Sequence, residues 1–480
     1  MPAARPVPSA ADRHLLKRFS YGITPALTDE VYRLGGADQW FSRQLNHKDI
    51  SDGYANGLRN WFPALDKTPQ QLWHTDQTGG QQGFEVTADY ERWTMLRRAY
   101  SKRQVQETMV EFWANLLHIP CPEAKSWPHR VRYDTTLRQH ALGRFDDMVV
   151  ACVLHPAMLL YLDNAVSQAS NINENLGREV LELHTVGVAG DYTEDEVQDS
   201  ARILTGYRVD AWETWTPYYA EEDHFRGQVS VLGFSDPNPS YNGRDLTKRY
   251  LRYLATHPVT ARRIARRLCV RFISDDPSPA VVDAVTAAFV QSGTDIKQTL
   301  RALVAHPEFA ASAGDKTRTP TQDAIATYRA LGLEVMPPSK KEDFAYSLLH
   351  QVNSMGQQPF GWVRPDGFPD VADAWTSISR MLGSWRAHWG LAGGYWPKSG
   401  VRHRTMGEWL PALPARFDEV VDHISRLVLA KPASKTHQRA VTAFTTIQPF
   451  ERIRTSSDLP EYKLVQLLSV LLDSPAHMTR

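Results

Sequence analysis

Hydrophobic residues recur every three to four positions along most of this chain, which is the spacing of helices that bury one face. Polar corners containing Pro or Gly separate these runs. The pattern predicts a mainly α-helical protein: a multi-helix orthogonal bundle with long irregular loops and at most a small β-hairpin. The clearest runs span residues 86–118, 133–154, 173–186, 258–272, 280–291, 295–305, 321–331 and 461–472.

Local signals mark where several helices begin. His155-Pro156, His257-Pro258 and His306-Pro307 each place Pro where a first helical residue is expected, because Pro lacks the N–H that a first turn leaves unpaired. Thr193 followed by Glu196 matches a capping box, in which each side chain bonds the other residue's backbone amide.

Two segments break the helical pattern. Residues 208–245 are rich in aromatics, Gly and Pro, and their alternating run 228–232 favours a hairpin. Residues 357–373 form a long aromatic loop. The Met-Pro-Pro-Ser-Lys-Lys stretch at 336–341 is the best linker candidate, so we expect a helical core over 1–335 and an aromatic-rich helical region over 336–480 packed on it.

Composition narrows the class of protein. A chain of 480 residues is long enough for two or three packed helical layers. Its 54 basic side chains balance its 54 acidic ones, which argues against a nucleic-acid partner. Three separated cysteines read as core residues. Neither an 18-residue apolar run nor a signal peptide is visible, so the chain as written is expected to be cytoplasmic without a membrane span, with export by a removed signal left open.

Three motifs stand out in the sequence: Asn173-Glu-Asn-Leu-Gly-Arg-Glu-Val-Leu-Glu-Leu-His-Thr185, Arg271-Phe-Ile-Ser-Asp-Asp-Pro277 and Pro365-Asp-Gly-Phe-Pro369. With others, they resemble motifs of the bacterial domain-of-unknown-function family 1800. The resemblance implies a mostly helical domain with no assigned activity, and a sulfatase-like partner protein. One departure is that Trp113-Ala-Asn-Leu-Leu117 stands where the family commonly has Trp-His-Asn-His-Phe, which removes those histidines as candidates here.

The Asn173–Thr185 motif suggests a metal site formed by Glu179, Glu182 and His184. At about 100° per residue, however, His184 projects roughly 160° away from Glu182 on an α-helix. We therefore predict no metal ligand here and interpret His184 as a core residue.

The other side of the same predicted helix is a dense polar face. One interpretation is an ion-paired surface, with Glu174 and Arg178 spaced i,i+4. The other is a cleft wall where one carboxyl acts as general acid while a neighbour stays ionised. Asn173 lies off the face and is most simply a helix cap, but it remains a weak binding candidate. The face itself comprises Glu174, Asn175, Arg178, Glu179 and Glu182.

Arginines form a stripe along the predicted helix 258–272. They could hold sulfate, phosphate or carboxylate groups in bidentate fashion. Alternatively they meet acidic residues of the protein itself, including the polar face just described. The stripe comprises Arg262, Arg263, Arg266, Arg267 and Arg271.

Loop residues supply further candidates. His224 lies on a predicted loop, from which a general base can enter a cleft. Trp362, Arg364 and Asp366 combine an indole with both charges, which suits stacking on a sugar ring. The other indoles nearby in sequence are Trp375, Trp385, Trp389 and Trp396, and they suit a helical core equally well.

Three hypotheses follow, and the sequence leaves open whether the chain is an enzyme. The first is an enzyme acting on a glycan or other polar polymer, with Glu174, Glu179 or Glu182 as acid/base residues, Arg178 orienting them, and His224 as a further base. Asp163 or Asp366 could supply a carboxylate from across the cleft. Asn173, Asn175, Arg262, Arg266, Trp362, Arg364 and Asp366 are its predicted substrate-binding residues.

The second hypothesis is a metal-dependent oxygenase or hydrolase built on Glu179, Glu182 and His224. The third is a non-catalytic scaffold that binds a partner protein or polymer through the arginine stripe and the tryptophan loop. The cofactor is undetermined: no GxGxxG after a strand, no Walker-type loop and no GxSxG elbow occurs, which argues against nucleotide binding and serine hydrolase chemistry.

Overall fold

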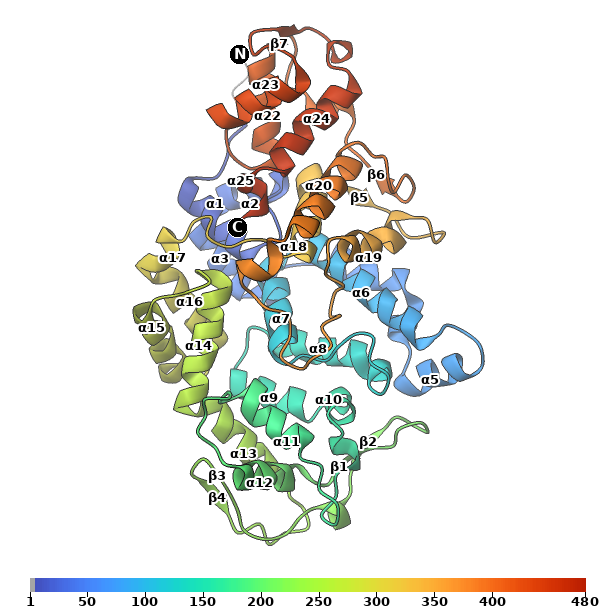
Figure 1. The fold of residues 1–480 in the computed structure, drawn as a ribbon, viewed down its shortest axis with the longest axis vertical. Coiled ribbons are helices and arrows are strands. Elements are labelled where there is room, and N and C mark those ends of the chain that lie inside the picture. Colours follow the sequence, from blue (N-terminus) through green and yellow to red (C-terminus); the bar gives the residue numbers. More distant parts are fainter. Residues whose placement is uncertain (1–4) are drawn as a thin grey trace.

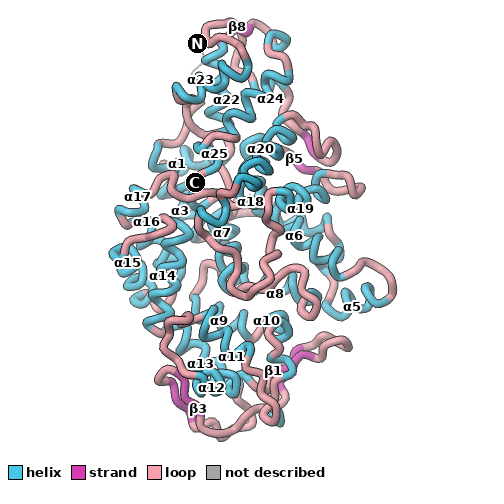
Figure 2. The backbone as a smooth tube through the Cα atoms, in the orientation of Figure 1, coloured by secondary structure: helices cyan, strands magenta, loops and turns pink. Residues whose placement is uncertain are grey.

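A computed structural model describes residues 5–480 and shows a mainly helical chain, at 60%. Its strands form only small two-stranded antiparallel sheets, so the predicted fold class is confirmed (Figure 2). Within residues 5–480, no helix is long and apolar enough to cross a membrane. All three cysteines are buried and free, as expected for core residues.

The first part of the chain supplies the centre of the molecule, where α6 and α7 are buried along most of their length (Figure 1). The apolar run 86–118 proves to be these two helices, which are separated at Ser101. There the Asp52 carboxylate accepts hydrogen bonds from Ser101 Oγ and from the Lys102 amide, at 2.7 and 2.8 Å. The helices are α1 Ala10–Phe19, α2 Pro25–Leu34, α3 Ala37–Leu45, α4 Gly53–Gly57, α5 Pro69–Gln77, α6 Gly83–Tyr100, α7 Gln104–Leu116 and α8 Arg130–His140.

The next part forms the green lower portion of Figure 1, which carries two hairpins. The predicted excursion 208–245 contains both hairpins, one more than the alternating run indicated. The elements are α9 Phe145–Val153, α10 Pro156–Tyr161, α11 Asn175–Glu179, the π-helical turn Val180–His184, α12 Glu194–Leu204, β1 Tyr207–Val209, β2 Pro217–Tyr219, β3 Val229–Val231, β4 Phe234–Asp236 and α13 Arg244–Thr256.

A run of antiparallel neighbours follows, in which α15 packs against both α14 and α16. Three helices begin with the predicted His-Pro pair. His155, His257 and His306 cap α10, α14 and α17, and the first residue of each of these helices is Pro. The helices are α14 Pro258–Phe272, α15 Pro279–Gln291, α16 Ile296–Ala305, α17 Pro307–Ala311 and α18 Pro320–Leu331.

The last part packs against the centre through α19 on α6 and α20 on α18. The strand pair β5–β6 joins residues on the two sides of position 336, and the division of the chain there stays a prediction. The elements are β5 Glu334–Val335, α19 Phe344–Ser354, α20 Ile378–Ala392, β6 Val401–Arg402, α21 Met406–Trp409, β7 Ala415–Arg416, α22 Phe417–Val428, α23 Lys435–Thr445, β8 Arg452–Ile453, α24 Glu461–Leu472 and α25 Pro475–Met478.

Between α19 and α20 the chain makes a long excursion, residues 357–373, which we call the aromatic loop. In Figure 1 it is the orange segment that runs down from α19 and passes over α7 before returning to α20. Because it leaves its own region to lie on α7, it forms a wall of the site described next. Short 3-10 turns join other elements: His47–Asp49, Leu58–Trp61, Pro63–Asp66, Trp127–His129, Asn164–Val166, Glu221–Asp223, Ala372–Trp375 and Ser456–Asp458.

Candidate functional site

The arginine stripe of α14 lines a cavity of about 490 Å³ between α7, α14, the start of α18 and the aromatic loop. Ile264, Leu268 and Phe272 are fully buried on the core side of α14. Arg263, Arg267 and Arg271, spaced four residues apart, lie on the side that lines the cavity. The amphipathic pattern of this helix therefore places its guanidinium groups around one pocket.

One end of this pocket is a compensated ion cluster. Glu111 of α7 forms ion pairs with Arg98, at 3.1 Å, and with Arg271. Arg271 also pairs with Asp370 of the aromatic loop, at 3.2 Å. Burial alone would raise the pKa of Glu111, but Arg98 and Arg271 lower it to about 2. This end of the pocket is charge-balanced by the protein itself.

The other end carries arginines without a carboxylate partner. Within residues 5–480, neither Arg263 nor Arg267 has a carboxylate oxygen within the 4.0 Å of an ion pair, and Arg267 forms no hydrogen bond either. Burial, and for Arg263 also the charge of Arg267, lower the pKa of both guanidiniums, that of Arg263 to about 10. For Arg267 the more distant charges of Asp370 and Asp366 offset the effect of burial only in part. A cation whose desolvation is incompletely compensated is where an anionic ligand gains most.

Arg263 is held in place by the segment after the π-helical turn. Its Nη1 donates a hydrogen bond to the Thr185 carbonyl at 3.2 Å. Gly187, at φ +89°, passes so close that a Cβ there would lie 2.8 Å from Arg263 Cδ. The Asn173–Thr185 motif and Gly187, which follows it, therefore position Arg263 at the pocket.

Side chains on α7 and just after it bind the backbone of the aromatic loop. The Asn115 side chain donates to the Phe368 carbonyl and accepts from the Phe368 amide, both at 2.7 Å. His118 Nε2 lies 2.8 Å from the Trp362 carbonyl oxygen, and burial lowers the pKa of His118 to about 4. Gly367, at φ +74°, is required here because a Cβ would lie 2.1 Å from the Asn115 carbonyl oxygen. The Trp113–Leu117 segment thus meets the Pro365–Pro369 motif.

Three predicted binding residues of the loop do come together. Trp362 Nε1 donates to Asp366 Oδ1 at 2.6 Å, and Arg364 lies 3.6 Å from Asp366 Oδ2. The Arg364 guanidinium also lies over the Trp362 ring, 5.1 Å from its centroid. All three residues line the pocket, which gives it an indole face beside a carboxylate.

The carboxylates of the polar face divide into two groups. Arg178 forms ion pairs with Glu174, at 3.4 Å, and with Glu194, at 2.6 Å, so this end of the face is an ion-paired surface. Asn173 Oδ1 accepts the Asn175 amide at 2.9 Å, which is the capping role considered for it. Arg178 is therefore directed to Glu174 and Glu194, away from the role of orienting Glu179.

Glu179 stands apart from that surface. It is half-buried, and burial, then the charges of Glu182 and Asp366, raise its pKa to about 7. Burial together with Glu123, Glu179 and Asp366 also raises the pKa of Tyr161 to about 12. Asp366 lines the pocket and its charge helps to raise the pKa of both Glu179 and Tyr161, whereas Glu179 and Tyr161 are not themselves part of the pocket lining.

The π-helical turn that follows Glu179 modifies the helical projection used on the sequence. Gly187 donates its amide to the Leu181 carbonyl at 2.9 Å, which closes a wider turn than an α-helix has. His184 is nevertheless fully buried, with Nδ1 3.2 Å from the Leu116 carbonyl oxygen. This agrees with the interpretation of His184 as a core residue.

His224 lies elsewhere. It is 2% exposed, with Nδ1 3.0 Å from the Thr205 carbonyl oxygen and Nε2 3.1 Å from Asn238 Oδ1. Both ring nitrogens are therefore engaged in holding the hairpin region. In the described part of the chain, Glu179, Glu182 and His224 form no group that could share a metal ion. The arrangement required by the metal-dependent hypothesis is absent from these residues.

The remaining predicted residues separate by position. Arg262 is exposed and pairs with Asp283, outside the pocket lining, whereas Arg266 lines the pocket and lies 4.0 Å from Asp276. Three arginines of the stripe do meet acids of the protein itself, as one of the two alternatives had it: in the described residues their ion pairs go to Glu111, Asp370, Asp276 and Asp283, and none goes to the Glu174–Glu182 face.

The indoles do not form one cluster around Arg364. Trp362 and Trp375 flank Phe368 of the aromatic loop, at ring distances of 5.4 and 5.9 Å. Trp385 and Trp389 instead lie on α20, 44% and 37% exposed, and Trp396 follows that helix. Closeness in sequence misled here because α20 leads away from the loop.

Sequence reasoning missed Arg98, Glu111 and Asp370, the ion cluster at the balanced end of the pocket. A signal did exist, since Glu111 interrupts the apolar run of α7 between Val110 and Phe112. A carboxylate in such a run implies a buried cationic partner. Its cationic partners, Arg98 and Arg271, lie on two other helices, α6 and α14, which no spacing along the chain reveals.

A family model described as "Protein of unknown function (DUF1800)" matches residues 14–479 of this chain. No curated protein and no solved structure matches it.

Proposed function

We propose that this chain, which belongs to the DUF1800 family of proteins of unknown function, is an enzyme that acts on an anionic glycan or similar polar polymer. Its substrate would bind in the arginine-lined pocket, and carboxylate acid/base chemistry would act at the pocket edge. The observation that carries the proposal is the pair of partly buried guanidiniums, Arg263 and Arg267, without a carboxylate partner in residues 5–480.

Anion recognition is the first part of the proposal. Two guanidiniums four residues apart on one helix face present planar pairs of N–H donors, which fit a carboxylate, sulfate or phosphate group. A cavity of about 490 Å³ has the size of a small-molecule site, so it suits one or two sugar residues better than a macromolecular surface. Trp362 offers the flat apolar face on which a sugar ring stacks.

Acid/base chemistry is the second part. With a pKa of about 7, Glu179 can hold a proton near neutral pH and donate it to a leaving oxygen. Asp366 accepts a hydrogen bond from Trp362 and lies beside Arg364, which orient its carboxylate. The two groups would divide the roles of acid and base, with Asp366 as the carboxylate from across the cleft rather than Asp163, which pairs with Lys125.

The test compares binding and turnover of charged and neutral oligosaccharides. We expect sulfated or uronate-containing oligosaccharides to bind, and matched neutral ones to bind at least about 10-fold more weakly, since each charge-assisted contact contributes over 1.4 kcal/mol. Arg267→Ala should abolish that difference. Arg262→Ala is the matched control, because Arg262 lies on the same helix outside the pocket.

Glu179→Gln separates chemistry from binding. It should leave affinity for the charged oligosaccharide within about 2-fold and lower kcat by about 100-fold or more. Equal binding of charged and neutral oligosaccharides by the unaltered protein would refute the anion site. Full turnover by the Glu179→Gln variant would refute the acid/base role.

A binding scaffold is the second candidate function, and one feature favours it. Ile378, Leu382, Trp385 and Trp389 form an exposed apolar stripe along α20, with exposures of 80%, 55%, 44% and 37%. Stripes of this kind occur where partner proteins dock. If the chain is a scaffold, Leu382→Asp should abolish capture of a sulfatase-like partner while Arg267→Ala leaves it intact.

A further inference from the structure

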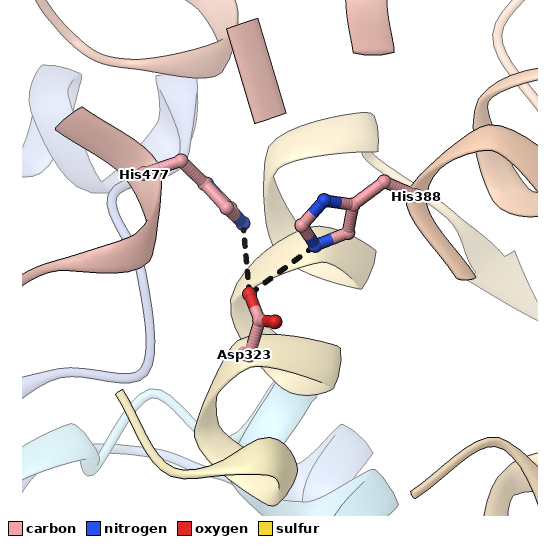
Figure 3. A group of neighbouring side chains, drawn as sticks. All are labelled: Asp323, His388 and His477. Carbon is pink, nitrogen blue, oxygen red and sulfur yellow. Dashed lines mark hydrogen bonds and ion pairs between the residues drawn. The ribbon is translucent and has the colours of Figure 1, made fainter. Parts of the chain in front are cut away.

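A second set of polar side chains converges outside the lining of the arginine pocket. Asp323 of α18, His388 of α20 and His477 of α25 point toward one another in Figure 3, although up to 154 residues separate them in sequence. Nε2 of His388 lies 3.2 Å from Asp323 Oδ1, and Nε2 of His477 lies 3.6 Å from the same oxygen. Within residues 5–480 this is the one group of its kind whose ligand atoms lie within 4.8 Å of one another.

The three side chains are enclosed by protein. Asp323 is 0% exposed, His388 1% and His477 4%. Polar groups buried this deeply require partners, and Ser384 Oγ donates to Asp323 Oδ2 at 2.7 Å while Arg380 lies 3.4 Å from that same oxygen. The Ser384 hydroxyl and the Arg380 guanidinium thus both contact Asp323 Oδ2, while Oδ1 faces the two imidazoles.

We propose that Asp323, His388 and His477 bind one divalent transition-metal ion of the zinc class. Two imidazole nitrogens and a carboxylate oxygen are ligands that zinc prefers. With bonds of about 2.0–2.2 Å in a tetrahedron, ligand atoms lie about 3.3–3.5 Å apart. The observed 3.2 and 3.6 Å lie close to this spacing, and all three ligand atoms lie within 4.8 Å of one another.

The surroundings of the three ligands match those of a metal site. Nδ1 of His388 lies 2.7 Å from Asp473 Oδ1, which fixes the ring so that Nε2 faces the shared centre. Such a carboxylate behind a histidine ligand is the usual outer partner in zinc proteins. Thr327 Oγ1, 3.0 Å from His477 Nε2, lies close enough to complete the coordination directly or through a water molecule.

Burial assigns a structural role to this ion. Substrate has no access to ligands with exposures of 0–4%. The ion would join α18, α20 and α25, three helices that no short connection links. Since Thr321 and Gln322 in the first turn of α18 line the arginine pocket, the ion would also hold one wall of that pocket.

The competing arrangement is a network of ordinary ion pairs and hydrogen bonds, with a proton on His388 shared between Asp323 and Asp473. It uses the same atoms, so the choice rests on metal content and spectroscopy. The full-length untagged protein, purified without chelator, should retain about one zinc ion per chain, measured by mass spectrometry of the metal. After metal removal, Co²⁺ should give the intense visible absorption of a tetrahedral cobalt site.

Variants localise the ion. His388→Gln and His477→Gln should each lower Zn²⁺ affinity by about 100-fold or more, and Asp473→Asn by about 10- to 100-fold, measured by competition with a chromophoric chelator. His47→Gln, a buried histidine outside the cluster, is the matched control and should retain the ion. If the unaltered protein holds no metal after purification and shows neither the cobalt absorption nor a Tm rise with Zn²⁺, the ion-pair network is correct and the metal site is refuted. That measurement on unaltered protein decides the matter even where a variant fails to fold.

Discussion

Replacing Gly367 by Ala tests whether the aromatic loop is held on α7 by close backbone fit. A Cβ at Gly367 would lie 2.1 Å from the Asn115 carbonyl oxygen and 2.7 Å from Asn115 Oδ1. Real Cβ contacts essentially never fall under 3.0 Å, so the loop would have to move by about 1 Å. The 2.7 Å hydrogen bonds between Asn115 and Phe368 cannot survive such a shift in their present geometry.

The expected loss has two parts. Placing Ala at φ +74° costs about 1–2 kcal/mol, and losing two hydrogen bonds costs about 1 kcal/mol each. The free energy of unfolding should therefore fall by about 3–4 kcal/mol. Gly356→Ala is the matched control, since Gly356 has φ +92° but no atom within 4 Å of its Cβ position, and it should lose only about 1–2 kcal/mol.

Equilibrium unfolding in urea, followed by circular dichroism, measures both losses. Hydrogen exchange of residues 357–373 adds a local measure, because the loop should exchange faster in Gly367→Ala and remain protected in Gly356→Ala. Equal losses in the two variants, or unchanged exchange in Gly367→Ala, would show that the close approach to Asn115 does not hold the loop.

Three further predictions concern the charged groups. Glu111→Ala leaves Arg98 and Arg271 without their shared carboxylate, so unfolding free energy should fall by about 3–5 kcal/mol in urea titrations; a loss under about 1 kcal/mol would contradict the pairing. Arg267→Ala removes a cation with no carboxylate partner in residues 5–480, so Tm should stay unchanged or rise, and a marked fall would show a hidden partner. The pKa of Glu179 is raised from 4.5 to about 7, so the folded state binds the proton more tightly, and this contribution to stability is lost as pH rises from about 4.5 to about 7. Glu179→Gln should flatten Tm against pH in that interval, and an unchanged slope would refute the shift.

Helix identity and helix starts were predictable because they depend on neighbours in sequence. The capping box of Thr193 and Glu196 and the His-Pro starts at His155, His257 and His306 appear in the structure as expected. Apolar spacing also placed the arginines on one side of α14. What this pattern could not do was divide the run 86–118 at Ser101, because the partner that stabilises that corner, Asp52, lies about 50 residues earlier.

The candidate site was predictable only in fragments. Trp362, Arg364 and Asp366 were selected together and do lie together, since one five-residue stretch of the loop contains them. The sequence favoured Glu179 and Arg178 as one functional unit. The structure separates them, because Arg178 forms an ion pair with Glu194 of the next helix. His224 had the sequence signature of a loop base, but Thr205 and Asn238 bind both of its ring nitrogens.

The sequence by itself determined the helical class, the ends of many helices, and the side of α14 that is charged, because these depend on interactions within one turn or two. Tertiary structure alone decided which arginines keep a carboxylate partner. Arg271 meets Glu111 and Asp370, whereas Arg263 and Arg267 on the same face meet none in the described residues. The reason is that charge compensation acts between atoms a few ångströms apart in space, and their distance along the chain carries no record of it.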